Sequence, residues 1–335
     1  MNRKLTTLVA ASAAGILFAI TGCSSDSGGA AAGEEFVAGD PTAAEQSDLT
    51  FAMYRQATAA PVFGAKEAGA EDTFGVAVEP SWVESSSAGM NLLLGGDAQL
   101  AYSSYWGVVD AMVQGMDVAI VETMFTFTPG IMTLESLPDS GVEDLEDLLG
   151  KKVAVPALNS AQHNRLEYAF LDAGLDSSTV EYVPMPFGEV TAGLANGTID
   201  AGAVAGPVLT VLKDEYDSTT VLDFAGGLFE GHGEGGIITT GEFARENPNT
   251  IAAFQCEWAE GVSAVEDDEL FASILETELG FDEELIPSEI EKKPTYGLDA
   301  DPESLAKFPE IMQEIGTLDE DVDLGSIIIP LPKSC

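Results

Sequence analysis

The segment VEDLEDLLGKKVAVP, residues 142–156, contains the alternation that decides the fold. Its first part predicts a helix over 142–149 that ends at Gly150, because glycine readily adopts the left-handed conformation found after helix C-termini. The apolar run over 152–155 predicts a buried strand. A helix followed directly by a buried strand is typical of α/β proteins.

The same alternation continues on both sides of this segment. Short apolar runs predict strands over 49–53, 74–78, 99–102, 118–121, 180–183, 201–204 and 221–224. Apolar residues at helical spacing predict helices over 61–69, 88–94 and 105–115, and a helix that opens near 160 and ends at Gly174. The pattern predicts an α/β fold in which each lobe has a mostly parallel sheet flanked by helices.

The length of the chain favours two lobes, because the roughly 290 residues that follow the expected signal and tether exceed what one hydrophobic core usually holds. We expect residues 48–126 and 238–335 to form lobe 1, and residues 127–237 to form lobe 2. The extended segment 125–134 and the segment 237–240, which follows a glycine-rich stretch, are the expected hinge crossovers. Glycine there would permit the backbone changes that a hinge needs.

Residues 1–22 predict an export signal that is removed from the mature protein. Arg3 and Lys4 precede an apolar run over 5–20 that is too short to span a membrane stably. The sequence Ile20-Thr21-Gly22-Cys23 then resembles the lipobox of bacterial lipoproteins, whose cysteine thiol receives a diacylglyceryl group. The alternative is an ordinary signal peptide in which this cysteine is incidental.

Residues 23–47 are expected to form a flexible tether, because Ser, Gly and Ala dominate their first part without an apolar period. No later stretch approaches 18 uninterrupted apolar residues, so no transmembrane helix is expected after the signal. With the lipid on Cys23, the protein should be anchored to the cell membrane on its extracytoplasmic face.

The charge of the chain excludes one class of partner. The sequence has 57 acidic and 13 basic residues, and removal of Arg3 and Lys4 leaves 11 − 57 = −46 for the mature chain. Nucleic acid is not an expected partner, since its phosphates must be met by Lys and Arg. Acidity at this level keeps a protein soluble, but it does not identify a ligand, because local charge can oppose net charge.

Three cysteines are present, and Cys23 is assigned to the lipid. Cys256 and Cys335 are the remaining pair in a protein expected outside the cytoplasm, where thiols are commonly oxidised. A disulfide between them is favoured, and two free thiols are the alternative. Neither the cysteine spacing nor that of His163 and His232 matches a metal site, and no cofactor is expected.

Several ordered pieces of the chain resemble one known family. They are PVFGAKEAG (61–69), AMVQG (111–115), VEDLEDLLGKKVAVP (142–156), AGL (173–175) and NGTIDA (196–201). In order and spacing the chain resembles the periplasmic-type binding proteins of the nitrate, sulfonate and taurine importers, a group that also includes binders of thiamine precursors. The resemblance runs from about Leu49 to Gly280.

This resemblance implies a two-lobed periplasmic-binding-protein fold of type II, with two hinge crossovers. It also implies a monomer that captures a small molecule and delivers it to the permease of an ABC importer. Two positions depart from the family. Its members usually have Asp where this chain has Gln99, and often have Glu-Pro where this chain has Gly206-Pro207. Both lie near the ligand in the family, so the ligand contacts of its other members do not transfer to this chain.

Loops at the carboxyl ends of strands are the expected ligand site, because ligands of two-lobed α/β proteins settle there. The candidate ligand-binding residues are Tyr54, Arg55, Ser103, Ser104, Tyr105, Asn159, Ser160, Gln162, His163 and Gly206. Three of these loops open helices, whose free backbone N–H groups favour an anionic or strongly polar oxygen. The two helix-opening serines, Ser104 and Ser160, can equally act as simple N-caps.

The ligand class remains open between two chemistries. Arg55 can bind a sulfonate, carboxylate or nitrate through two hydrogen bonds, or it can form an ordinary surface ion pair. Tyr54, Tyr105, Trp106 and Phe127 can instead form the walls of a site for a pyrimidine or another aromatic. A small sulfonate-like anion is the leading hypothesis.

Catalysis is not expected. The thiamine-pyrimidine synthases that share the fold depend on a cysteine-rich segment and iron chemistry, and this chain has too few cysteines for that. No P-loop, dinucleotide-binding glycine motif or Ser-His-Asp spacing is present. A lipoprotein that senses a ligand without transporting it is a third hypothesis, which the sequence does not separate from transport.

Overall fold

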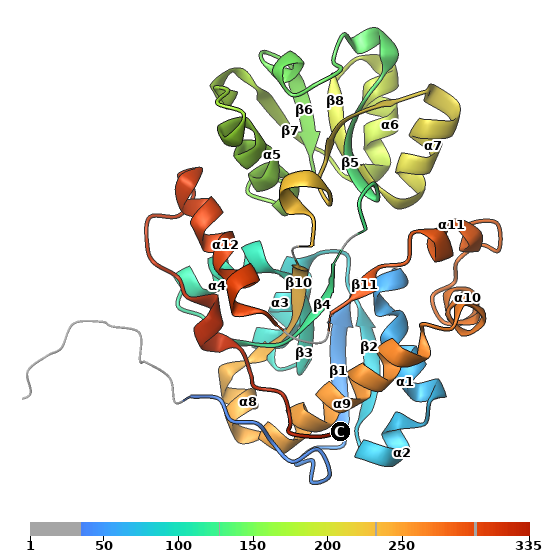
Figure 1. Ribbon diagram of the computed structural model, residues 1–335, viewed down its shortest axis with the longest axis vertical. Coiled ribbons are helices and arrows are strands. Elements are labelled where there is room, and N and C mark those ends of the chain that lie inside the picture. The colour runs from blue at the N-terminus through green and yellow to red at the C-terminus, as the bar shows by residue number, and fades with distance from the viewer. Residues whose placement is uncertain (1–34, 127, 232, 298–299) are drawn as a thin grey trace, which may run out of the picture. The chain divides into compact units, whose positions relative to one another are not determined.

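The computed structural model describes residues 35–335 apart from 127, 232 and 298–299, and within them the strands form two sheets (Figure 1). Sheet A has the order β11–β4–β10–β3–β1–β2, and sheet B has the order β7–β6–β8–β5–β9. The strands of sheet A are β1 Asp48–Met53, β2 Ala77–Trp82, β3 Leu100–Ser104, β4 Val118–Thr126, β10 Gly233–Thr240 and β11 Thr295–Tyr296. The strands of sheet B are β5 Met132–Ser136, β6 Lys152–Val155, β7 Glu181–Pro184, β8 Ala201–Ala205 and β9 Thr219–Asp223.

Helices cover both faces of each sheet (Figure 1). Those of sheet A are α1 Ala60–Glu67, α2 Ala70–Phe74, α3 Ser86–Gly95, α4 Tyr105–Val113, α8 Gly241–Glu246, α9 Pro248–Ala264, α10 Asp268–Thr277, α11 Ile286–Glu291 and α12 Pro302–Glu314. Those of sheet B are α5 Ala161–Asp172, α6 Phe187–Asn196 and α7 Gly206–Tyr216. In sheet A, α1 and α9 pack on one face, whereas α3, α4 and α12 pack on the other.

The chain passes twice between the sheets, from β4 to β5 and from β9 to β10. Two lobes joined by two crossovers were predicted, and this part of the fold is confirmed. The prediction of mostly parallel sheets is confirmed, although both sheets are mixed and neither is purely parallel. In sheet A, β10 runs antiparallel to β3 and β4. In sheet B, β5 runs antiparallel to β8 and β9. Each crossover ends in a strand that runs antiparallel to both of its neighbours: β5 in sheet B and β10 in sheet A.

Three local predictions differ from the structure. The helix expected over 142–149 is only a 3-10 turn at Glu146–Leu148. Here the Asp144 carboxylate accepts the backbone N–H groups of Glu146 and Asp147, and this side-chain capping competes with a regular helix. The strand expected over 74–78 begins at Ala77, since α2 occupies the preceding residues. The second lobe boundary, expected at residue 237, falls inside β10.

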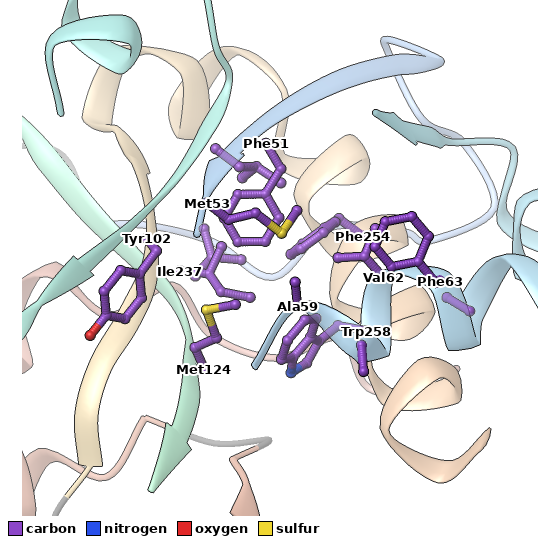
Figure 2. Close-up of a cluster of buried hydrophobic side chains, with 14 of the residues drawn as sticks. Phe51, Met53, Ala59, Val62, Phe63, Tyr102, Met124, Ile237, Phe254 and Trp258 are labelled. Atoms are coloured by element: carbon purple, nitrogen blue, oxygen red, sulfur yellow. The ribbon is translucent and has the colours of Figure 1, made fainter. Parts of the chain in front are cut away.

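The largest core lies between sheet A and the helices α1 and α9. Phe51 of β1 meets Phe254 of α9 edge to face, with ring centroids 6.1 Å apart. Figure 2 shows these rings with Met53, Ile237 and Trp258 in one cluster, and it shows the Tyr102 hydroxyl pointing away from the cluster. Burial of such large side chains stabilises a fold by about 1.5–3 kcal/mol each.

Both ends of the described chain are fastened to α9. The Glu45 carboxylate accepts the backbone N–H groups of Asn249 and Thr250 at 3.2 and 2.7 Å, a favourable place for negative charge at a helix N-terminus. Phe36 also enters the core, so the second part of the predicted tether lies against the fold. A disulfide joins Cys256, on α9, to Cys335. The export signal and Cys23 lie outside the described residues.

Strand β2 is an edge of sheet A and carries Pro80 in its middle.

Among the residues that the structure describes, no helix is both long and apolar enough to cross a membrane.

One buried acid couples the stability of the fold to pH. Glu257 of α9 is only 4 % exposed, and it accepts the Val76 N–H at 3.3 Å. Burial, with a smaller contribution from the nearby Glu71, raises the pKa of Glu257 to about 7. The folded protein therefore holds this proton more tightly than the unfolded chain, and stability falls as pH rises from about 4.5 through 7.

We predict that Glu257→Gln raises the free energy of unfolding at pH 8 by about 2 kcal/mol and leaves it almost unchanged at pH 4.5. The amide oxygen can still accept the Val76 N–H, whereas the cost of a buried charge disappears. Urea unfolding at several pH values measures the difference. Glu260→Gln, at an exposed position of the same helix, is the control and should change little. Equal effects of the two variants at pH 8 would contradict the prediction.

Candidate functional site

The carboxyl end of β3 leads directly into α4. Ser104 ends the strand, and its hydroxyl accepts the Gly107 N–H at 3.3 Å, so it caps the helix. Ser103 is buried, and its hydroxyl donates to the carbonyl oxygen of Ser104 at 3.2 Å. Both serines lie beside β10, where Ser103 pairs with Gly236 and Ser104 with Gly235. The capping alternative therefore holds for Ser104, and capping does not prevent a ligand contact.

Close packing at β10 requires its glycines. A Cβ on Gly235 would lie 2.5 Å from the Ser103 carbonyl oxygen, and one on Gly236 would lie 3.1 Å from the Tyr105 ring. Tyr105 is fully buried, and its hydroxyl hydrogen-bonds with Thr123 at 2.7 Å. The structure thus gives Tyr105 a packing role, and burial raises the pKa of its hydroxyl.

Two tyrosines meet where β1 and β3 end. The rings of Tyr54 and Tyr102 are 5.3 Å apart and tilted by 59°. Tyr54 is half-buried, and its hydroxyl hydrogen-bonds with Ser86 at 2.8 Å. Burial raises the pKa of both tyrosines, and the charge of Glu234 raises it further. The Tyr102 ring lies against Gly235, the residue after Glu234, where a Cβ would be 2.7 Å from the ring.

A buried ion pair connects the two sheets. Arg165 of α5, beside sheet B, contacts Glu234 of β10, in sheet A, with Nη2 and Oε2 2.5 Å apart. Only 2 % of the arginine side chain and 4 % of the glutamate side chain are exposed. Arg165 also donates to the Phe224 carbonyl oxygen at 3.0 Å and lies over the Phe229 ring. Burial raises the pKa of Glu234, and the guanidinium opposes this rise.

Other buried polar atoms have unused hydrogen-bonding capacity. Among the described residues, the buried Arg165 Nε, Asn164 Oδ1 and Trp106 Nε1 have no hydrogen-bond partner. Buried polar groups normally have one, so unpaired donors and acceptors often mark sites that a ligand completes. Trp106 itself packs edge to face on Phe308 of α12, at 5.2 Å.

The start of α5 holds four of the predicted residues. Ser160 caps the helix by accepting the His163 N–H at 3.4 Å. Asn159 has a left-handed φ of 61° and donates its N–H to His163 Nδ1. Gln162 is buried, and its amide contacts the Met132 sulfur at 2.8 Å. His163 packs on Tyr182, and burial lowers its pKa, so it is mainly neutral at pH 7. Gln162 and His163 thus have partners within lobe 2.

Arg55 lies apart from this group. Its side chain is exposed, and its guanidinium stacks 4.9 Å from the centre of the Trp82 ring, on the edge strand β2. Gly206 begins α7 with a left-handed φ of 57°. It lies on the face of sheet B opposite α5. The predicted aromatic residue Phe127 and His232 lie outside the described residues.

The structure thus brings Tyr54, Ser103 and Ser104 close to a group that the sequence analysis did not select. That group is Tyr102, Arg165 and Glu234. A signal was present for Arg165, which lies at helical spacing from Ala161 and Ala169 and directly before Leu166. Burial at such a position requires a charged partner. No comparable signal existed for Glu234 in its glycine-rich surroundings.

Residues 56–268 match the family model described as NMT1/THI5 like. The chain belongs to this family. No curated protein sequence matches it, but solved structures do. The aliphatic sulfonate-binding protein SsuA from Escherichia coli has 16 % identity and a TM-score of 0.71 over 85 % of this chain and 98 % of its own.

Two further structures show the same fold as this NMT1/THI5-like chain. SsuA from Xanthomonas axonopodis pv. citri, solved with bound MOPS, has 18 % identity and a TM-score of 0.70, over 85 % of this chain and 99 % of its own. The nitrate-binding protein NrtA from Synechocystis PCC 6803 has 16 % identity and a TM-score of 0.64, over 85 % and 86 %. The predicted relationship to nitrate- and sulfonate-binding proteins is confirmed, and at these identities the likeness extends to the fold alone.

We predict that Arg165→Met lowers the free energy of unfolding by about 3–5 kcal/mol, because it leaves the Glu234 charge buried without a partner. The double variant Arg165→Met with Glu234→Leu should recover much of this loss, since both charges are then absent. Urea unfolding measures all three proteins. Lys152→Met, which breaks an exposed ion pair with Glu181, is the control and should cost less than about 1 kcal/mol. A double variant no more stable than the single one would contradict this account.

Proposed function

We propose that the protein is an extracytoplasmic solute-binding lipoprotein that captures a small molecule and delivers it to an ABC importer. The fold carries this proposal, since solved proteins of the same architecture bind sulfonates and nitrate. The export signal and lipobox-like cysteine in the sequence fit a protein held at the outer face of the membrane. The protein has no chemistry of its own in this proposal, and acts by binding and release as its lobes open and close.

The ligand that suits the site best is a small oxyanion that also carries an amino group, as taurine does. A guanidinium can bind a sulfonate or carboxylate through two hydrogen bonds, and a buried carboxylate can pair with an ammonium. When the lobes separate, a zwitterion can therefore enter between Arg165 and Glu234. Its sulfonate then pairs with Arg165, and its ammonium pairs with Glu234. The Tyr102 ring lies against Gly235, the residue after Glu234, and the Tyr54 ring lies beside it, so the two rings can also attract an ammonium.

A planar aromatic such as an aminopyrimidine is the second candidate. The tilted pair of Tyr54 and Tyr102 offers aromatic surface at the ends of β1 and β3. Such a ligand would use Glu234 as a hydrogen-bond acceptor and would not need Arg165 to carry a free charge.

Calorimetric titration with taurine, ethanesulfonate, nitrate and 4-aminopyrimidine distinguishes these ligand classes. We expect taurine to bind more tightly than ethanesulfonate by about tenfold, because only taurine brings an ammonium to Glu234. Glu234→Gln should remove this preference by weakening taurine and not ethanesulfonate. Binding of 4-aminopyrimidine alone would move the assignment to the aromatic class. No heat with any of the four would overturn the proposed ligand classes.

The lipid anchor has its own test. Cys23→Ser should move the protein from the membrane fraction to the soluble fraction and abolish incorporation of a palmitate analogue, because only the thiol accepts the diacylglyceryl group. Fractionation and metabolic labelling of expressing cells measure this. Ser24→Ala is the matched control and should remain labelled. A Cys23→Ser protein that stays with the membrane would contradict the anchor.

A further inference from the structure

Arg165 is held by residues that lie on the lobe 2 side of β10. Its Nη1 donates to the Phe224 carbonyl oxygen at 3.0 Å, and the Phe229 ring covers its guanidinium, with Cζ 5.1 Å from the ring centre. Phe229 ends the 3-10 turn Gly227–Phe229, is only 3 % exposed, and packs on Tyr168 of α5 with ring centroids 6.1 Å apart. None of these contacts involves sheet A, so separation of the lobes can leave them intact.

The contact of Arg165 with lobe 1 is less complete. Its Nη2 lies 2.5 Å from Glu234 Oε2, but among the described residues neither that oxygen nor Arg165 Nε has a partner with hydrogen-bond geometry. Nε and Nη2 lie on one edge of the planar guanidinium, and such an edge can bind two oxygens of one anion side by side. Glu234 thus compensates the charge of this edge without satisfying both of its donors. Since buried donors are normally satisfied, the edge is suited to a second acceptor.

We propose that Phe229 is a positioning residue, which keeps the Nε–Nη2 edge of Arg165 directed for an anion while the lobes are apart. The anionic end of the ligand therefore binds lobe 2 first, and closure then brings Glu234 of lobe 1 to the ligand. This inference rests on the proposed function, to which it adds an order of binding and a residue that acts only through Arg165. A ring over a guanidinium occupies its face and leaves its edge free. An arginine held in this way loses less rotamer freedom when the ligand binds.

The ligand-free protein tests whether Phe229 holds Arg165. After residue 22 the sequence has only three arginines, at positions 55, 165 and 245, so ¹⁵N labelling of arginine gives few side-chain NMR signals, and Arg165→Met identifies those of Arg165. We expect separate Nη1 and Nη2 signals for Arg165, because the ring and the carbonyl contact restrict rotation about the Nε–Cζ bond. The two signals should stay separate in Glu234→Gln and merge in Phe229→Leu. Phe229→Tyr retains a ring over the guanidinium and should restore the separation.

Titration of the same samples with ethanesulfonate and taurine tests the order of binding. Ethanesulfonate should shift the Arg165 Nε signal in the parent and in Glu234→Gln alike, because the anion needs only lobe 2. Phe229→Leu should weaken ethanesulfonate and taurine equally, by about tenfold, since the ring acts on the anionic end that they share. Glu234→Gln should weaken taurine alone. Phe229→Tyr should bind both as the parent does, which a loss of packing at this position would not allow.

Phe187→Leu makes the same substitution at a partly buried ring of α6 in lobe 2 and is the matched control, with unchanged Nη signals and affinities expected. The proposal is overturned if the Nη signals merge in Glu234→Gln, because lobe 1 would then hold Arg165, or if they stay separate in Phe229→Leu. It is also overturned if ethanesulfonate binds without shifting the Arg165 Nε signal. Failure of every probe to bind would overturn the proposed ligand and the order of binding together, whereas the signals of the free protein would still decide the role of Phe229.

Discussion

The ion pair between Arg165 and Glu234 is the interaction on which the arrangement of the candidate site depends. Two buried charges are favourable only when they meet, because each alone would remain desolvated without compensation. The arginine lies on a helix of one sheet and the glutamate on a strand of the other. Their contact therefore sets how the start of α5 faces the ends of β1 and β3.

Strand β10 makes that contact possible. Its glycines allow the Tyr105 ring and the Ser103 carbonyl to approach the backbone closely, so the strand fits between β3 and β4. Glu234 lies within this glycine run and is held where the chain returns from sheet B. A hinge near this point would have to move a strand that is hydrogen-bonded on both sides. Motion between the lobes is thus not expected within sheet A.

The sequence predicted the strands well and the site only in part. Buried strands such as β1, β6 and β8 are short apolar runs, so local pattern is sufficient to find them. Strand β10 is different, because the partners that make a glycine-rich segment a strand lie far away in the sequence. The same limit applies to the site. Helix-opening serines are visible locally, whereas the partnership of Arg165 with Glu234 exists only in three dimensions. Arg55 shows the reverse case, since its position after a strand does not reveal that its side chain turns toward Trp82.

The edge strand β2 affects whether copies of this protein associate with one another when they are crowded. An exposed edge normally offers a row of free donors and acceptors to a strand of another molecule, and so it promotes self-association into fibres or aggregates. Pro80 removes a donor from the middle of β2, and the exposed Glu79 beside it carries a charge. Molecules crowded side by side should therefore repel one another at this edge, and even a dense layer of them should resist aggregation.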